Sequence, residues 1–257
     1  MQDLKVTLLQ VDQAWEDKQG NFNKYEAVFS HLVETDLVLL PEMFHTGFSM
    51  NVSALAEDWE DSEGLNFLKK WAKQLDSSIY TSLIIKEGTY YYNRGVFVYP
   101  NSEVKCYDKR KSFGLGGEDQ FYKAGNDEVI VEWKGWRINL QICYDLRFPE
   151  LIRNRIEKGV AAYDLLLYVA NWPKKRIAHW DVLLRARAIE NQCYVVGVNR
   201  IGTDGNGLEY CGESACYNAL GEKTPFSDVK QLTFETITLN QSDLQKTRQN
   251  LPFLIDR

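Results

Sequence analysis

Histidine, cysteine and long apolar runs are scarce in this chain, and each scarcity excludes a class of function. The three histidines include no two at metal-ligand spacing. The five cysteines are odd in number and show no Cys-x-x-Cys spacing, and Cys211 and Cys216 lack a matching pair of ligands, so zinc binding is an unlikely interpretation. No stretch approaches the ~18–20 apolar residues of a membrane span. The first ten residues, interrupted by Asp3 and Lys5, lack a secretory signal. We therefore expect a cytoplasmic protein with no membrane partner, no metal and no cofactor.

The charge balance is acidic. The formal net charge is -6, and the lysines and arginines are dispersed, which argues against nucleic acid as a partner. A compact chain of 257 residues buries roughly 70–75% of its unfolded surface, so it needs no disulfide or metal for stability. No linker, internal repeat or low-complexity stretch divides it. We expect a single domain over residues 1–257.

Apolar periodicity predicts alternating strands and helices. The expected strands are residues 4–10, 36–40, 78–85, 90–99, 129–133, 137–142, 164–170, 193–199, 214–217 and 230–239. The expected helices are residues 23–34, 63–75, 149–158, 176–191 and 242–249, the last with Ser242 as its cap. Several of the strands are joined by hairpin turns. Strands with helices on one side predict an α/β fold of two sheets packed face to face, with the helices outside.

Cys143 ends the apolar run 138–142 and is followed by Pro149-Glu150, a pair that suits the first turn of a helix. A strand that turns sharply into a helix exposes the residue at the turn among free backbone N–H groups. A thiol there is a candidate nucleophile beside an anion-stabilising site. For a lone cysteine, however, a buried structural role is the better interpretation, so other residues must decide.

Two further segments supply those residues. Glu42 follows the buried-type strand near residue 40, and Lys109 follows a strand-like stretch at 104–108. Glutamate, lysine and cysteine at three strand ends resemble the nitrilase superfamily of carbon–nitrogen hydrolases. The matching pieces, in the family's order, are Pro41-Glu42-Met43, Tyr107-Asp108-Lys109, residues 142–150, Ala170-Asn171-Trp172-Pro173, residues 185–192 and Val198-Asn199-Arg200. Residues 198–207 look most like the omega-amidase branch, which hydrolyses 2-oxoglutaramate and similar side-chain amides.

The resemblance implies a four-layer α-β-β-α sandwich and a homodimer formed through the outer helices. It also implies that Cys143 is the nucleophile, that Glu42 is the general base and acid, and that Lys109 holds the oxyanion. Glu118 matches a second family glutamate that orients the lysine and the substrate amide. Its alternative is a carboxylate on a surface loop.

The resemblance also implies a role for Arg147, which matches an arginine that binds the substrate carboxylate in related members. A guanidinium suits a carboxylate because it donates two parallel hydrogen bonds. The alternative is an arginine in a core ion pair with Glu150 or Glu190. We expect the pocket walls to include Tyr144, whose backbone N–H would also face the oxyanion, together with Phe48, Trp172 and His45.

The leading prediction is an amidase that releases ammonia from small 2-oxo dicarboxylate monoamides (2-oxoglutaramate, 2-oxosuccinamate) through a thioester. A nitrilase or a carbamoyl or other small-amide hydrolase on the same scaffold stays open. A catalytically silent interaction subunit is the alternative from another class, and the retention of Glu42, Lys109 and Cys143 argues against it. The chain departs from the family pattern at Lys111-Ser112, where His-Leu is common, and at Leu220, where proline is usual.

Overall fold

The computed structural model describes residues 2–224 and 233–257, and its main feature is a pair of stacked sheets. In strand order, the first sheet contains β16 (Thr233–Leu239), β1 (Leu4–Gln10), β2 (Leu37–Leu39), β4 (Ser78–Glu87), β5 (Tyr90–Val98) and β6 (Val104–Asp108), with β3 (Glu57–Asp58) beside β4. The second contains β15 (Ala215–Tyr217), β12 (Tyr194–Asn199), β11 (Leu165–Ala170), β8 (Trp136–Ile142) and β7 (Ile130–Trp133). Two short hairpins, β9 (Ile156–Glu157) with β10 (Val160–Ala161) and β13 (Ile201–Thr203) with β14 (Glu209–Cys211), stand apart.

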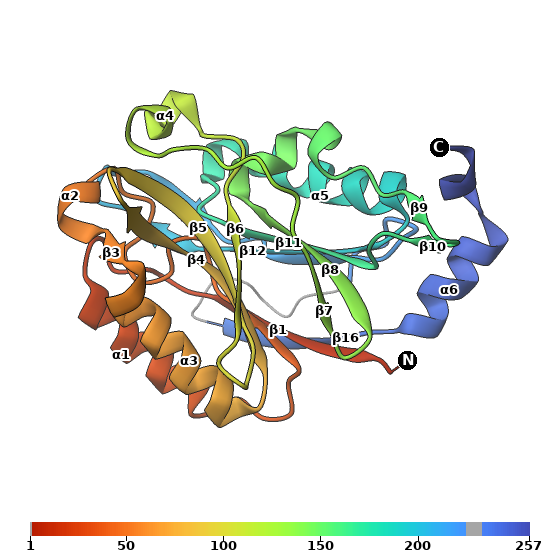
Figure 1. The fold of residues 1–257 in the computed structure, drawn as a ribbon, viewed down its shortest axis with the longest axis horizontal. Coiled ribbons are helices and arrows are strands. Elements are labelled where there is room, and N and C mark those ends of the chain that lie inside the picture. The colour runs from red at the N-terminus through yellow and green to blue at the C-terminus, as the bar shows by residue number, and fades with distance from the viewer. Residues whose placement is uncertain (1, 225–232) are drawn as a thin grey trace.

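Helices cover the outer faces of both sheets (Figure 1). The first sheet is covered by α1 (Lys18–Phe29) and α3 (Glu63–Leu75), and the second by α5 (Ile177–Asn191). The remaining helices are α2 (Val52–Leu55), α4 (Glu118–Phe121) and α6 (Gln241–Asn250). Short 3₁₀ turns lie at Trp59–Asp61, Gly114–Gly116, Cys143–Arg147, Pro149–Leu151, Lys174–Arg176 and Phe253–Asp256. The predicted α-β-β-α sandwich is confirmed.

The alternation of side chains along the central strands builds the layers. In β1, Leu4, Val6 and Leu8 point into the core between the sheets, whereas Leu9 packs against the helices. Successive side chains of a strand point to opposite faces, and a strand covered on both faces reads as a continuous apolar run. These strands are therefore buried on both sides.

Parallel pairing aligns the strand ends that carry the polar motifs. In the first sheet β2 is parallel to β1 and β4, and in the second β11 is parallel to β8 and β12. The carboxyl ends of parallel strands meet at one edge, where open α/β sheets place their ligand sites. Glu42 follows β2, Cys143 follows β8 and Asn171 follows β11.

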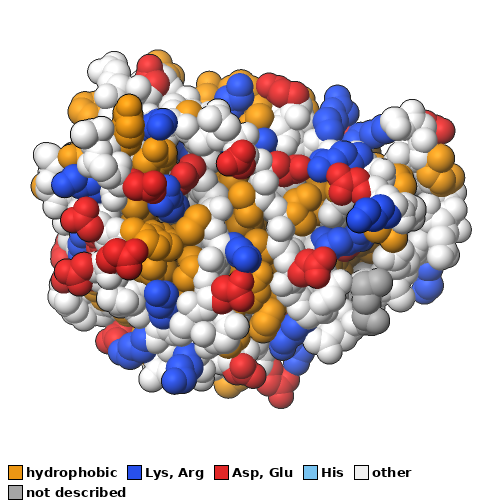
Figure 2. Space-filling model, in the orientation of Figure 1, with side chains coloured by type: hydrophobic (Ala, Val, Ile, Leu, Met, Phe, Trp, Pro, Cys, Tyr) orange, Lys and Arg blue, Asp and Glu red, His pale blue; other side chains and the backbone are white. Residues whose placement is uncertain are grey.

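One face of the molecule is charged, with both signs mixed (Figure 2). In the face shown in Figure 2, Lys and Arg side chains alternate with Asp and Glu around an area of hydrophobic side chains that lies over β4 and β5. Within the described residues, no helix has the length and apolarity needed to cross a membrane.

One predicted helix, residues 149–158, is wrong. Only Pro149–Leu151 form a 3₁₀ turn, and the chain then enters the β9–β10 hairpin. The buried Asn154 side chain donates to the carbonyl oxygens of Tyr163 and Asn191 at 3.0 and 2.9 Å and fixes this path without a helix. Lys158 and Gly159, with φ of 50° and 83°, form the tight turn, and positive φ at both positions is the signature of a two-residue hairpin.

Two helix starts were also misplaced. The first helix begins at Lys18, not near residue 23, because the Asp17 side chain accepts a hydrogen bond from the Gly20 N–H at 2.9 Å. The cap of α6 is Asn240, whose side chain accepts from the Asp243 N–H at 3.0 Å, and Ser242 lies inside the helix. Of the strand predicted at 230–239, residues 230–232 lie outside the described part.

Candidate active site

A cavity of about 540 Å³ opens at the carboxyl ends of the parallel strands, a volume typical of small-molecule sites. Its lining includes Glu42, Lys109 and Cys143, three residues far apart in the sequence. The structure therefore brings the predicted catalytic residues into one pocket. The predicted walls Phe48, Tyr144, Trp172 and Arg147 line the same cavity.

Cys143 stands at a strained turn. It follows β8 directly and adopts φ of 44°, a left-handed conformation that non-glycine residues seldom take. The buried carboxylate of Asp145 stabilises this turn by accepting from the backbone N–H groups of Ile142 and Lys111 at 3.0 and 2.9 Å. The predicted sharp turn after the strand is confirmed, although it leads into a 3₁₀ turn and not an α-helix.

The thiol of Cys143 is buried, and its Sγ lies 3.9 Å from the carbonyl oxygen of Asn171. Burial first, and the negative charge of Glu42 next, raise the pKa of this thiol well above its ordinary value, although Lys109 acts in the opposite direction. At neutral pH the thiol is therefore protonated, and it needs a base to become a nucleophile. The structural interpretation of a buried cysteine does not account for a thiol that lines a cavity beside a carboxylate and an ammonium.

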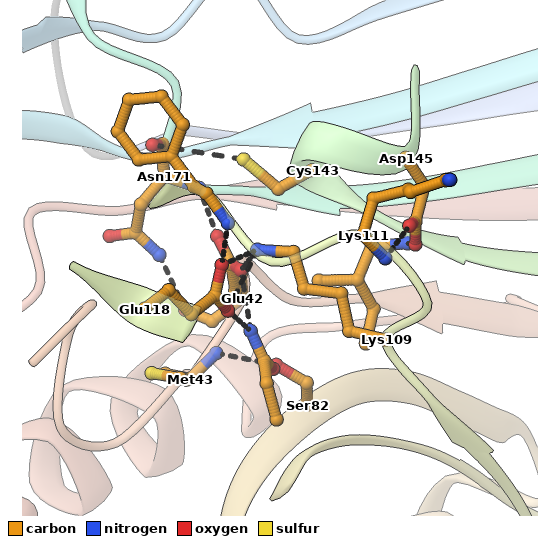
Figure 3. A network of polar contacts seen from close by, with 12 residues as sticks. Glu42, Met43, Ser82, Lys109, Lys111, Glu118, Cys143, Asp145 and Asn171 are labelled. Carbon is orange, nitrogen blue, oxygen red and sulfur yellow. Dashed lines mark hydrogen bonds and ion pairs between the residues drawn. The ribbon is translucent and has the colours of Figure 1, made fainter. Parts of the chain in front are cut away.

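Lys109 connects the two glutamates in a buried network (Figure 3). Its Nζ donates to Glu42 Oε1 at 3.0 Å and to Glu118 Oε2 at 2.8 Å. Burial alone would lower the pKa of Lys109, but the charges of Glu118 and Glu42 reverse this and raise it well above its usual value. Lys109 is therefore a fixed cation. Glu118 is almost completely buried, so its surface-loop alternative is wrong.

Two asparagines complete the network, and no sequence motif predicted a role in the site for either of them. Asn93 donates from one side-chain nitrogen to Glu42 Oε1 at 2.8 Å and to Glu118 Oε1 at 3.0 Å. The backbone N–H of Asn171 donates to Glu42 Oε2 at 3.0 Å, and its side chain donates to the Glu42 carbonyl oxygen at 2.6 Å. An asparagine directly before Arg94 within the predicted strand 90–99 was the only signal for Asn93, and it does not separate a site residue from a surface one. For Asn171 it was an asparagine directly after a buried strand.

Arg147 faces the pocket and not the core. Its guanidinium lies over the Trp172 ring, 4.6 Å from the centroid, and donates to His179 Nδ1 at 3.3 Å. The core-ion-pair alternative with Glu150 or Glu190 is wrong, because Glu190 pairs with Arg187 at 3.0 Å instead. Phe48 lies beneath the Lys109 ammonium, with 5.2 Å between nitrogen and ring centroid.

His45 does not line the pocket, contrary to expectation. It is fully buried behind the site, and its Nε2 lies 2.9 Å from Glu57 Oε1. It stacks on Phe44 and Phe22, with centroid distances of 4.7 and 5.5 Å. Sequence proximity to Glu42 was misleading because the turn after β2 directs His45 toward the helices.

Comparison with known proteins agrees with this geometry. The family model described as carbon-nitrogen hydrolase matches residues 5–249. The chain belongs to the carbon–nitrogen hydrolase family. The predicted membership of the nitrilase superfamily is thereby confirmed, and the chain is an enzyme of this family.

Relatives and a solved structure match this carbon–nitrogen hydrolase over 84 to 100% of its length. The omega-amidase YafV of Escherichia coli K12 is 42% identical, with 98% of this chain and 96% of the relative covered. The 2-oxoglutaramate amidase of Bacillus subtilis is 32% identical, with 84% of this chain and 83% of the relative covered. XC1258 of Xanthomonas campestris, a CN-hydrolase superfamily protein with an arsenic adduct in its active site, superposes with a TM-score of 0.97 at 41% identity, covering 100% of this chain and 98% of that one.

Proposed function

We propose that this carbon–nitrogen hydrolase is an omega-amidase that converts small 2-oxo dicarboxylate monoamides, 2-oxoglutaramate and 2-oxosuccinamate, to the acid and ammonia. The observation that carries the proposal is the Glu42–Lys109–Cys143 constellation in one cavity whose wall presents Arg147. The similarity to proteins named omega-amidase and 2-oxoglutaramate amidase supports this substrate class.

The first half of the reaction forms a thioester. The Cys143 thiol passes its proton to Glu42 as sulfur attacks the amide carbonyl carbon and the carbonyl electrons move onto oxygen. The Lys109 ammonium and the backbone N–H of Tyr144 stabilise that oxyanion, and loss of one such donor typically costs about 2.7–4 kcal/mol. Glu42 then returns the proton to nitrogen, the carbon–nitrogen bond breaks and ammonia leaves. General acid–base help of this kind contributes about 10²–10⁴ in rate.

The second half hydrolyses the thioester. Glu42 takes a proton from water as the water oxygen attacks the carbonyl carbon, and the same oxyanion site acts again. Collapse of the adduct breaks the carbon–sulfur bond and the thiolate recovers its proton. Glu118 and Asn93 keep Lys109 and Glu42 in place through hydrogen bonds of 2.8 to 3.0 Å. This sequence needs no cofactor.

The test is ammonia release from a panel of substrates. The panel contains 2-oxoglutaramate, 2-oxosuccinamate, glutamine, asparagine, a nitrile and a carbamoyl amine, with the Cys143→Ala protein as the control for contaminating activity. The 2-oxo amides should give the highest kcat/KM. If the nitrile or the carbamoyl amine is turned over faster than the 2-oxo amides, the proposal is rejected. If no substrate in the panel releases ammonia, the result favours a catalytically silent subunit.

We also propose that the enzyme is a homodimer joined through α5. Val182 and Ile189, two helical turns apart on this outer helix, have 63% and 49% of their surface exposed. Apolar residues in such a position favour contact with another protein surface. Light scattering measures the molecular mass of the native protein and of a double variant, Val182→Asp with Ile189→Asp. The native protein should have the mass of a dimer and the variant that of a monomer. A native monomer at micromolar concentration would contradict it.

A further inference from the structure

A second arginine, Arg176, lines the pocket beside Arg147. Its guanidinium lies over the Phe113 ring at 5.1 Å, and Phe113 packs edge-on against Tyr144 with 5.0 Å between centroids. Tyr144 in turn lies under Arg147, 5.8 Å from the guanidinium carbon to the ring centroid. The two cations are thus held by one continuous aromatic surface. We call Arg147, Arg176 and the rings of Phe113, Tyr144 and Trp172 the arginine wall.

The backbone of Arg176 is fixed by the same residue that supports Arg147. The indole Nε1 of Trp172 donates to the Arg176 carbonyl oxygen at 2.8 Å, and the Arg176 N–H donates to the Pro173 carbonyl oxygen at 2.9 Å. Trp172 itself is buried and carries the Arg147 guanidinium on its ring. Both guanidiniums are therefore positioned by a rigid support, a property of preorganised binding sites.

The wall carries positive charge that the described residues leave uncompensated. Neither guanidinium has a carboxylate within ion-pair distance in the described part of the chain. Burial first, and the nearby charge of Arg176 next, lower the pKa of Arg147. Two other carboxylates that line the cavity are engaged by neutral donors: Glu16 accepts from Ser49 at 2.5 Å, and Asp204 from Tyr210 at 2.9 Å. An anionic group bound at the wall would relieve the repulsion between the arginines.

We propose that Arg176 is a second specificity-determining residue, which acts with Arg147 to bind the 2-oxo acid end of the substrate and to reject a 2-ammonium group. This inference rests on the proposed function. The carboxylate and the adjacent 2-oxo oxygen offer acceptors to two guanidiniums, whereas Arg147 alone accounts for the carboxylate. The ammonium of an α-amino acid such as glutamine would lie beside two like charges, which disfavours it.

The test measures binding of the acid end without turnover. The probe is 2-oxopentanoate, which keeps the 2-oxo acid and has a methyl group in place of the amide, and its comparison is 2-aminopentanoate. For each compound, the rate at which iodoacetamide alkylates Cys143 is measured at increasing concentrations of the compound. The measurement is made on the native enzyme, Arg176→Gln and Lys175→Gln. Lys175 is the matched control because it is exposed on the same turn, carries the same charge and does not line the cavity.

Arg176→Gln should raise the half-protecting concentration of 2-oxopentanoate about tenfold to hundredfold, the range of a lost hydrogen bond to a charged group. Arg176→Gln should also lower the ratio of the half-protecting concentration of 2-aminopentanoate to that of 2-oxopentanoate. Lys175→Gln should change this ratio and the half-protecting concentration of 2-oxopentanoate less than about twofold. Arg176→Lys keeps the positive charge but loses the planar guanidinium, so its half-protecting concentration should lie between those of the native enzyme and Arg176→Gln. Thermal unfolding of each variant verifies the fold.

Unchanged protection in Arg176→Gln, or no protection of the native enzyme, would overturn the inference. Equal losses with 2-oxopentanoate and 2-aminopentanoate would show that Arg176 acts only on the carboxylate and would also overturn it. Ammonia release from 2-oxoglutaramate by the native enzyme is measured separately. If the native enzyme lacks that activity but its protection by 2-oxopentanoate depends on Arg176, the omega-amidase proposal is rejected and the anion site formed by the two arginines still stands.

Discussion

Asn171 holds Glu42 by two hydrogen bonds, from its backbone N–H to Oε2 at 3.0 Å and from its side chain to the Glu42 carbonyl oxygen at 2.6 Å. The two residues are 129 positions apart and follow strands of different sheets, β2 and β11. The position of the carboxylate that serves as base in our proposal therefore depends on how the two sheets pack.

Asn171→Ala should lower kcat about tenfold to hundredfold and change KM little. The backbone bond to Glu42 survives, but the side-chain bond that fixes its carbonyl is lost, and small misplacements of a catalytic group are costly. Steady-state kinetics with thermal unfolding is the measurement. A fall in activity that only follows a fall in the folded fraction would assign Asn171 a purely structural role.

Cys143→Ala should abolish hydrolysis while the fold stays intact, because only the sulfur nucleophile is removed. Cys143→Ser should be nearly as inactive, since Glu42 cannot readily ionise an alcohol. Turnover is measured beside circular dichroism, and a mass shift with a thiol-reactive substrate analogue should appear in the native protein alone. An active alanine variant would end the thiol mechanism.

Neutralising Glu42 should make Cys143 alkylate faster at neutral pH, even though it removes the proposed catalytic base. Burial, and then the charge of Glu42, raise the pKa of the Cys143 thiol, so alkylation of the native enzyme should accelerate as pH rises above neutrality. Glu42→Gln removes the charge of Glu42, the largest cause after burial, so the thiol should titrate at lower pH and alkylate faster at neutral pH, although turnover is lost. Iodoacetamide rates between about pH 6 and 10, on the rising part of the native profile, provide the measurement. An alkylation rate at neutral pH that stays the same or falls in Glu42→Gln would show that Glu42 does not act on the thiol by its charge.

The sequence predicted the layers and the catalytic residues because both depend on local patterns. Buried runs such as 164–170 identify strands by their composition, and Glu42 and Cys143 each follow such a run, in different sheets. Parallel pairing places each residue at the carboxyl edge of its own sheet, and the packing of the two sheets brings these edges together. Motif order then related these residues to a family. The comparisons confirm the family and the fold, while the residue roles stay predictions.

The sequence did not predict features that depend on tertiary contacts. The helix expected after Pro149 is replaced by a hairpin, because the Asn154 side chain finds partners at Tyr163 and Asn191 that no local pattern shows. Arg176 was placed at the start of a helix, and its role at the pocket emerges only when Phe113 packs beneath it. Polar side chains that bind distant backbone groups are therefore one source of the errors, while the misplaced helix starts come from local caps at Asp17 and Asn240.

Arg147 provides the last prediction, which concerns selectivity. If it binds the carboxylate far from the scissile amide, Arg147→Lys should raise KM for 2-oxoglutaramate, because an ammonium cannot reproduce two parallel hydrogen bonds or the stacking on Trp172. Arg147→Ala should cost on the order of 2–5 kcal/mol in kcat/KM, the range for a charge left without its partner.

Butanamide, an amide without that carboxylate, is the matched substrate for this test. It should be a poor substrate of the native enzyme, and the loss that either Arg147 variant causes on it should be much smaller than the loss on 2-oxoglutaramate. Measuring kcat/KM for the native and variant enzymes on both substrates separates the pairing from general damage, because damage to the fold lowers both values equally. Equal losses would mean that Arg147 only supports the aromatic packing of Trp172 and Tyr144, and binding of the carboxylate would then fall to another pocket residue.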